Sequence, residues 1–360
     1  MLNNIIYLVL GIFVSYFLID FIFFRKHSKR PILRTRLINI LIMLAILISF
    51  YLVVKEMSVY LFLQIFLLNI VDLCVLALAT TGIVLIFKTS VTTNFAQGTM
   101  ATFGAFAAAK QLLRLSATTE YSMTTKLIMV MGVAALTSFL IGLFIDLAII
   151  RRGRNVNAVG KQMITMGLVL ILFGFMPLVF GTTPLTIEAF SYDVKIFNIG
   201  EMMLILPTHN YYVLLITIGL LGLLFLALRF TKWGLGVRAT ASNETVASMM
   251  GVNTRLITAM SWAIAGALGG VAAFLYAPVG AQITSTFMTP VQVNSFLSAV
   301  LGGFSTFGGP LVGALLINMF QSMASFINSV WANVIVYTLV LFLVLAKPLG
   351  LFGKKTAKKV

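Results

Sequence analysis

Few side chains in this sequence could bind a metal ion or act as catalysts. The two histidines, His27 and His209, lie in different loops, and the single cysteine is Cys74. A zinc site needs a close group of Cys, His or carboxylate ligands, and the sequence has neither such a group nor an H-E-x-x-H motif. Serine–histidine catalysis would need a histidine inside the fold. We therefore expect no metal site, no intrachain disulfide and no catalytic centre.

The sequence also has no phosphate-binding loop. That loop reads G-x-x-x-x-G-K-[ST], because its backbone N–H groups and lysine hold the phosphates and its hydroxyl binds magnesium. The Gly-Lys pairs at 160–161 and 353–354 are followed by Gln162 and Lys355, which carry no such hydroxyl. The sequence thus predicts a chain that is not an enzyme and binds no cofactor itself.

One acid, Asp72, lies well inside an apolar run, close to Asn69. Ionisable residues within membrane spans often belong to ion or proton relays. One hypothesis is therefore a stand-alone secondary transporter coupled to an ion gradient through Asp72. The alternative is that Asp72 pairs with hydroxyl groups of a neighbouring helix or lies near the membrane interface. Asp146 lies one turn before Arg151, and we expect these two to pair at the inner membrane surface.

The elements that carry these residues are those of a membrane protein. Hydrophobic residues make up 60% of the chain and charged residues 9%, against about a quarter charged in soluble domains. Runs of about 20 apolar residues span a bilayer, and their backbone groups must pair within the segment. The alternation typical of barrel strands is absent. The predicted fold class is an all-α, polytopic transmembrane helix bundle of about 9–11 spans.

The expected spans differ in length. The run 61–87 is too long for one straight span, so we expect it to tilt or to start in the interface. The run 292–306 is short and is followed by several glycines, so it is re-entrant or broken. The full set is 4–24, 37–54, 61–87, 98–116, 126–150, 162–180, 210–230, 255–277, 292–306, 309–328 and 331–346.

The basic residues predict the orientation. Of the 25 Lys and Arg residues, all but Lys55, Lys110, Arg114, Lys126 and Lys195 lie in or beside loops on one side of the membrane. Positively charged loops stay inside, so we expect an outer N-terminus and a cytoplasmic C-terminus in a bacterial cytoplasmic (inner) membrane. The net charge of +16 is spread over these loops. This pattern favours membrane lipid as a partner and argues against nucleic acid.

Two loops are long enough to be more than connectors. The loop 181–209 is expected to form a polar cap on the outer side. The inner loop 231–254 is expected to carry a short helix from the N-cap Ser242 to Met250, stopped by Gly251. Its apolar face would fit a groove on another protein; the alternative is a helix that lies flat on the lipid. That face consists of Val246, Met249 and Met250.

A polar break separates two apolar runs near residue 95. Asn94, Gln97 and Thr99 place uncharged hydrogen-bonding groups there. Such a break at membrane depth is tolerated mainly where it faces protein or a water-filled cavity. It is therefore either part of a transport path or a capped turn at the inner surface. The small residues Gly98 and Gly104 would either allow close helix packing or line the same path.

A weak internal echo relates the two halves of the chain. Ala-Thr-Phe-Gly at 101–104 is similar to Ser-Thr-Phe-Gly at 305–308. Many transporters consist of duplicated halves whose broken helices meet at the substrate site. The echo therefore suggests a pseudo-repeat with broken helices, although a match of four residues also arises by chance.

The stretch 80–109 resembles the signature of branched-chain amino acid ABC permeases of the LivH-like subfamily. That signature has an apolar helix, a short turn, N-F-A-H-G-E and a Gly- and Ala-rich helix. The segment N-F-A-Q-G-T at 94–99 matches it, with Gln97 and Thr99 in place of histidine and glutamate. These two replacements leave the break uncharged.

The second half of the chain resembles the same family more fully. The loop 231–254 contains elements similar to the family's T-x-x-G-x-x-x-R-A and M-G-I-N. Later matching blocks are V-L-G-G-F at 300–304, G-G-P at 308–310 and K-P-L-G-L-F-G at 347–353. The likeness covers roughly residues 60–353 in order, and the first two spans have no counterpart in it.

The resemblance implies a permease subunit of an ATP-driven ABC importer for a small polar solute, such as a branched-chain amino acid or a related amino acid, amide or urea. The implied partners are a LivM-like second permease, two cytoplasmic ABC ATPases that hold the ATP, and an extracytoplasmic solute-binding protein. The implied domains are two extra helices at 1–55, a permease domain at 56–353 and a basic tail at 354–360. A structural or assembly protein without a transport path is a third hypothesis, which the polar breaks and the ordered signature disfavour.

The site residues that we predict fall into two groups. The substrate path is expected to include Asn94, Phe95, Gln97, Gly98, Thr99, Gly104, Gly302, Gly303 and Thr306. The residues expected to couple the chain to an ATPase are Arg238, Asn243, Glu244, Ala247, Met250, Gly251 and Asn253.

Overall fold

A computed structural model describes residues 59–353 except 154–155, 200–201, 281 and 348. Among these residues, six helices are long and apolar enough to cross a membrane, which confirms the predicted helical bundle. Every expected span from 61 onward overlaps one helix, except that the run 61–87 is divided between two. The spans 4–24 and 37–54 and the tail at 354–360 lie outside the described residues.

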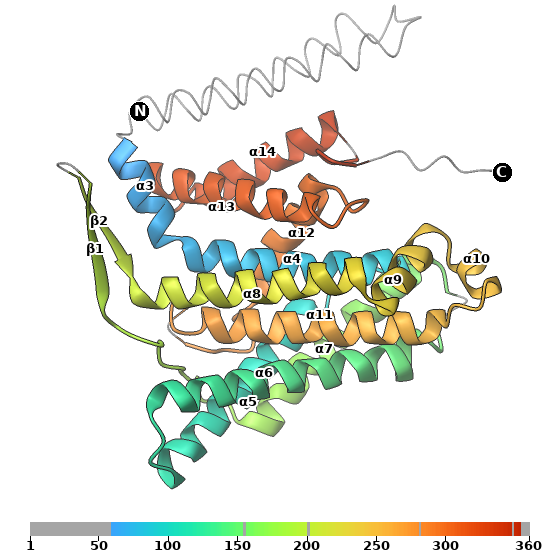
Figure 1. The fold of residues 1–360 in the computed structure, drawn as a ribbon, viewed down its shortest axis with the longest axis horizontal. Coiled ribbons are helices and arrows are strands. Elements are labelled where there is room, and N and C mark those ends of the chain that lie inside the picture. Colours follow the sequence, from blue (N-terminus) through green and yellow to red (C-terminus); the bar gives the residue numbers. More distant parts are fainter. Residues whose placement is uncertain (1–58, 154–155, 200–201, 281, 348, 354–360) are drawn as a thin grey trace, which may run out of the picture.

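Within the described residues, the helices form one bundle with a single β-hairpin (Figure 1). The helices are α3 (Val59–Leu68), α4 (Ile70–Ser90), α5 (Gln97–Thr118), α6 (Met123–Phe144), which continues as a π-helix (Ile145–Ile150), α7 (Ala158–Phe180), α8 (Thr208–Phe230), α9 (Lys232–Ser242), α10 (Glu244–Met249), α11 (Thr254–Tyr276), α12 (Thr289–Gly302), α13 (Gly309–Ile327) and α14 (Ala332–Ala346). The strands are β1 (Val194–Ile199) and β2 (Met202–Pro207).

Side-chain caps fix where several helices begin. The Asn157 side chain accepts a hydrogen bond of 2.7 Å from the Gly160 N–H at the start of α7. The Asn253 side chain accepts one of 3.1 Å from the Leu256 N–H at the start of α11. These bonds satisfy N–H groups that have no partner within the helix, which stabilises each start.

The two most buried long helices, α4 and α11, lie against each other at the centre of the bundle. Helix α4 packs on α12 and α13, whereas α11 packs on α5 and α6. Each central helix therefore packs on the helix pair that follows the other one in the chain. This exchange of partners is the arrangement expected of a pseudo-repeat in which α4–α6 correspond to α11–α13.

The sequence echo does not mark that repeat. Residues 101–104 lie within α5, whereas residues 305–308 lie in the turn before α13. In the exchanged packing α5 corresponds to α12, so the two tetrapeptides occupy different structural positions. The echo therefore does not coincide with the exchange of packing partners.

Glycines allow α6 and α11 to approach closely. A Cβ atom at Gly266 of α11 would collide with the backbone of Ser138, and one at Gly270 with the backbone of Ala134. In a membrane, where apolar burial does not drive helix association, such close contact is a main source of attraction.

The run 61–87 is not one straight helix, as its length predicted, because Asn69 separates α3 from α4. The Asn210 side chain donates hydrogen bonds of 3.0 and 3.1 Å to the carbonyls of Leu67 and Leu68 just before this break. A helix can bend in a membrane where side chains satisfy its exposed carbonyls. Asn210 does this here.

The loop 181–209, which we expect on the outer side, is more than a polar cap, because it contains the β-hairpin. Strand β1 pairs with β2 in antiparallel register, with Val194 opposite Pro207. The other edge of β2 is bound by α3, where the Gln64 carboxamide accepts from the Ile205 N–H (2.8 Å) and donates to the Ile205 carbonyl (2.9 Å). The hairpin lies at the end of the bundle opposite α9 and α10 (Figure 1). We call these the hairpin end and the α9–α10 end.

The connections expected on the inner side meet at the α9–α10 end. The Arg151 side chain forms an ion pair with Asp146 (3.7 Å) and donates to the Arg255 carbonyl (3.2 Å). The Lys88 ammonium donates to the Ser305 carbonyl (2.6 Å). The predicted pairing of Asp146 with Arg151 is confirmed, and the helix connections alternate between the two ends as the spans predicted.

Candidate functional site

The turn between α4 and α5 brings the start of α5 to the middle of the bundle. Helix α4 ends at Ser90, and its C-cap Val91 has a left-handed backbone with a φ of 50°. The Gln97 side chain then donates a hydrogen bond of 2.7 Å to the Ala265 carbonyl, about halfway along α11. A Cβ atom at Gly82, about halfway along α4, would lie 3.0 Å from the same Gln97 nitrogen. Helix α5 therefore begins at mid-depth between the two central helices.

Asn94 and Gln97 form a buried chain of hydrogen bonds in this turn. The Asn94 side chain accepts from the Ala96 N–H (2.9 Å) and donates to the side-chain oxygen Oε1 of Gln97 (3.1 Å). Both side chains are almost completely buried. The break is thus a hydrogen-bonded turn that lies about halfway along α4 and α11, and its role in a transport path stays a prediction.

Helix α7 holds the turn from another side. The Phe95 N–H donates to the Thr165 hydroxyl (3.3 Å), and the Gln162 amide donates to the Thr93 hydroxyl (3.1 Å). Each donor is a neutral group, and each acceptor belongs to the turn or to α7. Helix α7 therefore fixes the backbone path between α4 and α5.

Gln292 of α12 is the functional candidate that the sequence reasoning missed. Its side-chain carbonyl accepts from the Gly98 N–H, and its amide donates to the Phe95 carbonyl. One turn further along α12, the Phe296 ring lies 5.0 Å from the Phe95 ring, centroid to centroid. We call Asn94, Phe95, Gln97, Gly98 and Gln292 the α5–α12 junction.

The one sequence signal for Gln292 is a polar residue at the start of a short apolar run. No pattern relates it to Gly98, because 194 residues separate the two. Phe95, Gln292 and Phe296 remain partly exposed. Irregular backbone at membrane depth does not face lipid, so protein or water must cover this surface.

The other predicted path residues do not all lie at the junction. Thr99 is buried in the first turn of α5, next to it. Gly104 lies further along α5, where a Cβ atom would come within 2.8 Å of the Ala134 carbonyl of α6. The position of Gly104 therefore indicates a role in close packing between α5 and α6.

Gly302, Gly303 and Thr306 lie at the α12–α13 turn, roughly 15 Å along α12 from Gln292 at 1.5 Å per residue. Gly302 packs on Gly309. Gly303 has a φ of 89°, and it packs against the backbone of the C-terminal segment. The Thr306 hydroxyl accepts from the Gly309 N–H (3.0 Å) and so caps α13. The structure does not bring these three residues to the junction.

The loop 231–254 folds as two helices, α9 and α10, rather than one. Asn243, not Ser242, is the N-cap of α10, because its side chain accepts from the Val246 N–H (3.1 Å). The short helix ends before Gly251, whose φ of 83° suits a residue without a side chain. The predicted stop is thus observed and the predicted N-cap is wrong by one residue.

The apolar face of α10 is open. Met249 and Met250 are 80% and 79% exposed, and Val246 is also exposed, whereas Ala247 is buried against the rest of the loop. Arg238 donates to the Leu228 carbonyl and ties α9 to the end of α8. Of the residues predicted to couple the chain to an ATPase, Met250 is therefore the one that presents apolar surface. The other side chains that we have located, Arg238, Ala247 and the caps Asn243 and Asn253, stabilise the fold of the loop.

Asp72 lies in the first turn of α4, close to the break at Asn69, and is partly exposed. Among the described residues it forms no ion pair. The same part of the chain holds no group of three or more His, Cys, Asp or Glu side chains that could bind a metal.

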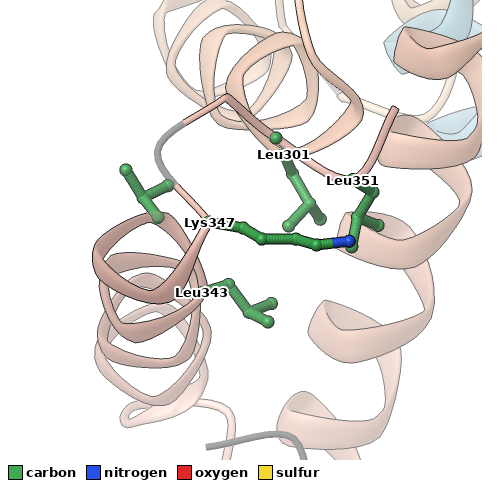
Figure 2. Close-up of a pocket in the computed structure, with 6 residues that line it drawn as sticks. Leu301, Leu343, Lys347 and Leu351 are labelled. Atoms are coloured by element: carbon green, nitrogen blue, oxygen red, sulfur yellow. The ribbon is translucent and has the colours of Figure 1, made fainter. Parts of the chain in front are cut away.

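A small pocket lies away from the junction, near the C-terminal segment. It is lined by Leu301, Leu343, Val344, Lys347, Gly350 and Leu351. Figure 2 shows the Lys347 side chain extended past Leu301 and Leu343 toward Leu351. The lining is aliphatic apart from Lys347, so the pocket offers few polar groups to a polar solute.

Comparisons with known proteins place the whole bundle in one family. The family described as "Branched-chain amino acid transport system / permease component" matches residues 65–345. A protein named "Probable branched-chain amino acid transport permease protein LivH" from Methanocaldococcus jannaschii is 26% identical over 291 residues, which are 77% of this chain and 88% of that protein.

Two bacterial relatives match over shorter stretches. The high-affinity branched-chain amino acid permease protein LivH of Salmonella typhimurium is 26% identical over 134 residues, 37% of this chain and 44% of the relative. BraD of Pseudomonas aeruginosa is 27% identical over 131 residues, 36% of this chain and 43% of the relative. The chain thus spans less than half the length of these two relatives. No solved structure gives a match.

Proposed function

Because this chain belongs to the family of branched-chain amino acid transport permease components, we propose that it is the transmembrane permease subunit of an ATP-driven importer. Its solute is a small polar molecule, such as a branched-chain amino acid or a related amino acid, amide or urea. The names of the relatives favour a branched-chain amino acid.

The observation that carries this proposal is the α5–α12 junction. A helix that begins at mid-depth, with an uncharged polar turn and partly exposed side chains, needs protein or water beside it. A transport path shared with a second permease would supply both the protein and the water. Discontinuous helices at mid-depth are also the usual setting of a transporter's substrate site.

The α10 face supports the proposed link to ATP hydrolysis. Met249, Met250 and Val246 present apolar side chains at the end of the bundle where the basic helix connections gather. Positive charge favours the cytoplasmic side, so this end faces the compartment that holds ATP. Two ABC ATPases would bind there, and an extracytoplasmic solute-binding protein would dock at the hairpin end.

The test is uptake of radiolabelled L-leucine by proteoliposomes that contain this chain with its co-purified partners. We expect uptake that requires ATP and the binding protein and that persists when ionophores remove ion gradients. Uptake that needs no ATP, and stops with ionophores or in Asp72→Asn, would instead support the secondary transporter. Recovery of the chain without any ATPase would also contradict the proposal.

A further inference from the structure

The π-helix at the end of α6 carries a buried carboxylate. Asp146 is 2% exposed, and its Oδ2 atom has no hydrogen-bond partner among the described residues. In the same part of the chain its ion-pair partner is Arg151, whose guanidinium lies 3.7 Å from that oxygen. A buried ion pair often stabilises a fold less than apolar residues of the same volume would. Stability alone therefore does not account for this pair.

The π-helix is what brings the two charges together. Its wide turn is closed by a hydrogen bond of 2.9 Å from the Arg151 N–H to the Asp146 carbonyl, five residues back. In an α-helix, residues five apart lie roughly 140° apart around the axis, because each residue turns by about 100°. Reversion of this turn to an α-helix would therefore move the Arg151 side chain away from Asp146. The ion pair and the π-helix stabilise each other, and single π-turns inside α-helices are frequent at functional sites.

Arg151 also binds the connection that follows α10. Its side chain donates a hydrogen bond of 3.2 Å to the carbonyl of Arg255, in the first turn of α11. Helix α10 ends at Met249 and α11 begins at Thr254, so residues 250–253 alone separate the exposed apolar face of α10 from this contact. One guanidinium group thus joins the π-helix to the turn between α10 and α11.

Close packing connects the rest of α6 to its neighbours. About one turn before the π-helix, a Cβ atom at Gly142 would collide with the Trp262 carbonyl of α11. Further back, the Ser138 hydroxyl donates a hydrogen bond of 3.1 Å to the Met100 carbonyl of α5. Close-packed helices shift as units rather than deform continuously. A displacement of α6 therefore reaches α5, whose first turn belongs to the α5–α12 junction.

We propose that the π-helix is a switch that couples α10 to the membrane bundle, and that Asp146 and Arg151 are the positioning residues that hold it in its present form. When an ATPase displaces the α10–α11 turn, Arg151 loses the Arg255 carbonyl, and the π-helix reverts to an α-helix that rotates the end of α6. Coupling of this kind needs an element with two discrete arrangements, which the π and α forms supply. This inference rests on the proposed function and deepens it, because it assigns the step between ATPase docking and movement of α5.

The experiment measures L-leucine uptake and ATP hydrolysis together, in proteoliposomes that hold the assembled transporter with its binding protein. Asp146→Asn and Arg151→Gln each remove one charge of the pair. Coupling between two sites is typically worth about 5–150-fold, so the number of leucine molecules imported per ATP should fall at least about fivefold in both variants while the ATPases stay bound. Arg151→Lys keeps the positive charge and should lose less. A pair with a purely structural role would instead lower uptake and hydrolysis in the same proportion.

Two further variants test whether the pair acts as one unit. Residues of one unit are not additive, so Asp146→Asn combined with Arg151→Gln should lose no more leucine per ATP than either single variant does. Arg152→Gln is the matched control, because Arg152 is the exposed neighbour of Arg151 and carries the same charge. It should keep the ratio of the unmodified transporter.

An unchanged ratio in both single variants would overturn the inference, as would an equal loss in Arg152→Gln or a loss in the double variant that equals the product of the two single losses. If Asp146→Asn does not assemble, the Arg151 variants decide, because that side chain is exposed. If the unmodified transporter still shows ATP-dependent uptake when the inference fails, the proposed function stands alone. If the unmodified transporter lacks such uptake, both fall.

Discussion

The contact between α6 and α11 can be tested at Gly266. In Gly266→Ala, the new methyl group would lie 2.9 Å from the Ser138 carbonyl carbon and closer still to its oxygen. Normal carbon contacts lie at about 3.5–4.0 Å, so the helices must separate by roughly 0.6–1 Å. Both neighbours are backbone atoms, so a change of rotamer cannot relieve the clash.

The expected cost follows from two opposing effects. Overpacking of this kind costs about 1–3 kcal/mol, whereas alanine stabilises a helix interior by up to about 1 kcal/mol over glycine. Gly132→Ala in α6 isolates the second effect, because a Cβ atom there has nothing within 4 Å. The free energy of unfolding of Gly266→Ala should therefore be about 1–3 kcal/mol below that of Gly132→Ala.

The assay is thermal unfolding of both purified variants in the same detergent, followed by size-exclusion fluorescence. A difference of 1 kcal/mol corresponds to about 2–4 °C in Tm for a chain of a few hundred residues, so Gly266→Ala should melt roughly 2–12 °C below Gly132→Ala. Equal Tm values in the two variants would refute the close approach of α6 and α11.

Three further predictions concern other parts of the chain. Met250→Ser should weaken binding of the partner ATPases at least about tenfold in a binding titration, because burial of a methionine stabilises by about 1.5–3 kcal/mol; unchanged affinity would exclude this face from the contact. Gln64→Leu should speed hydrogen exchange at the Ile205 amide about fivefold, since its bond to Gln64 contributes about 1 kcal/mol; unchanged exchange would mean that α3 does not protect β2. Asp72→Asn should leave ATP-driven leucine uptake within about twofold of the unmodified chain. Loss of uptake would instead support the ion-coupled mechanism.

The positions of the helices could be predicted because apolar run length reports directly on membrane crossing. The runs 162–180 and 255–277, for example, fall within a few residues of α7 and α11. Side-chain pairing between distant segments leaves no such local trace. The kink at Asn69 depends on Asn210, and the hairpin edge depends on Gln64, so neither feature could be read from its own segment.

Only one half of the candidate site, the turn between α4 and α5, could be predicted from the sequence. The polar turn at Asn94 and Gln97 interrupts an apolar run, which is a local signal. Gln292 completes the junction from a helix far along the chain, and only the exchanged packing of the two halves brings it there. Ser242 and Asn243 are both good N-caps, and the sequence alone does not decide between neighbours of equal propensity.

The exchanged packing of α4 and α11 also sets the order of events during synthesis. Helix α4 emerges about 200 residues before α12, one of its packing partners, a delay of roughly 10–40 s at 5–20 residues per second. During that time its polar side chains must be satisfied without this partner. Thr80 and Thr81 donate to the carbonyls of Leu76 and Ala77 within α4 itself, at 2.6 and 2.7 Å. A newly inserted α4 can therefore remain in the bilayer as a self-contained helix until the second half of the chain arrives.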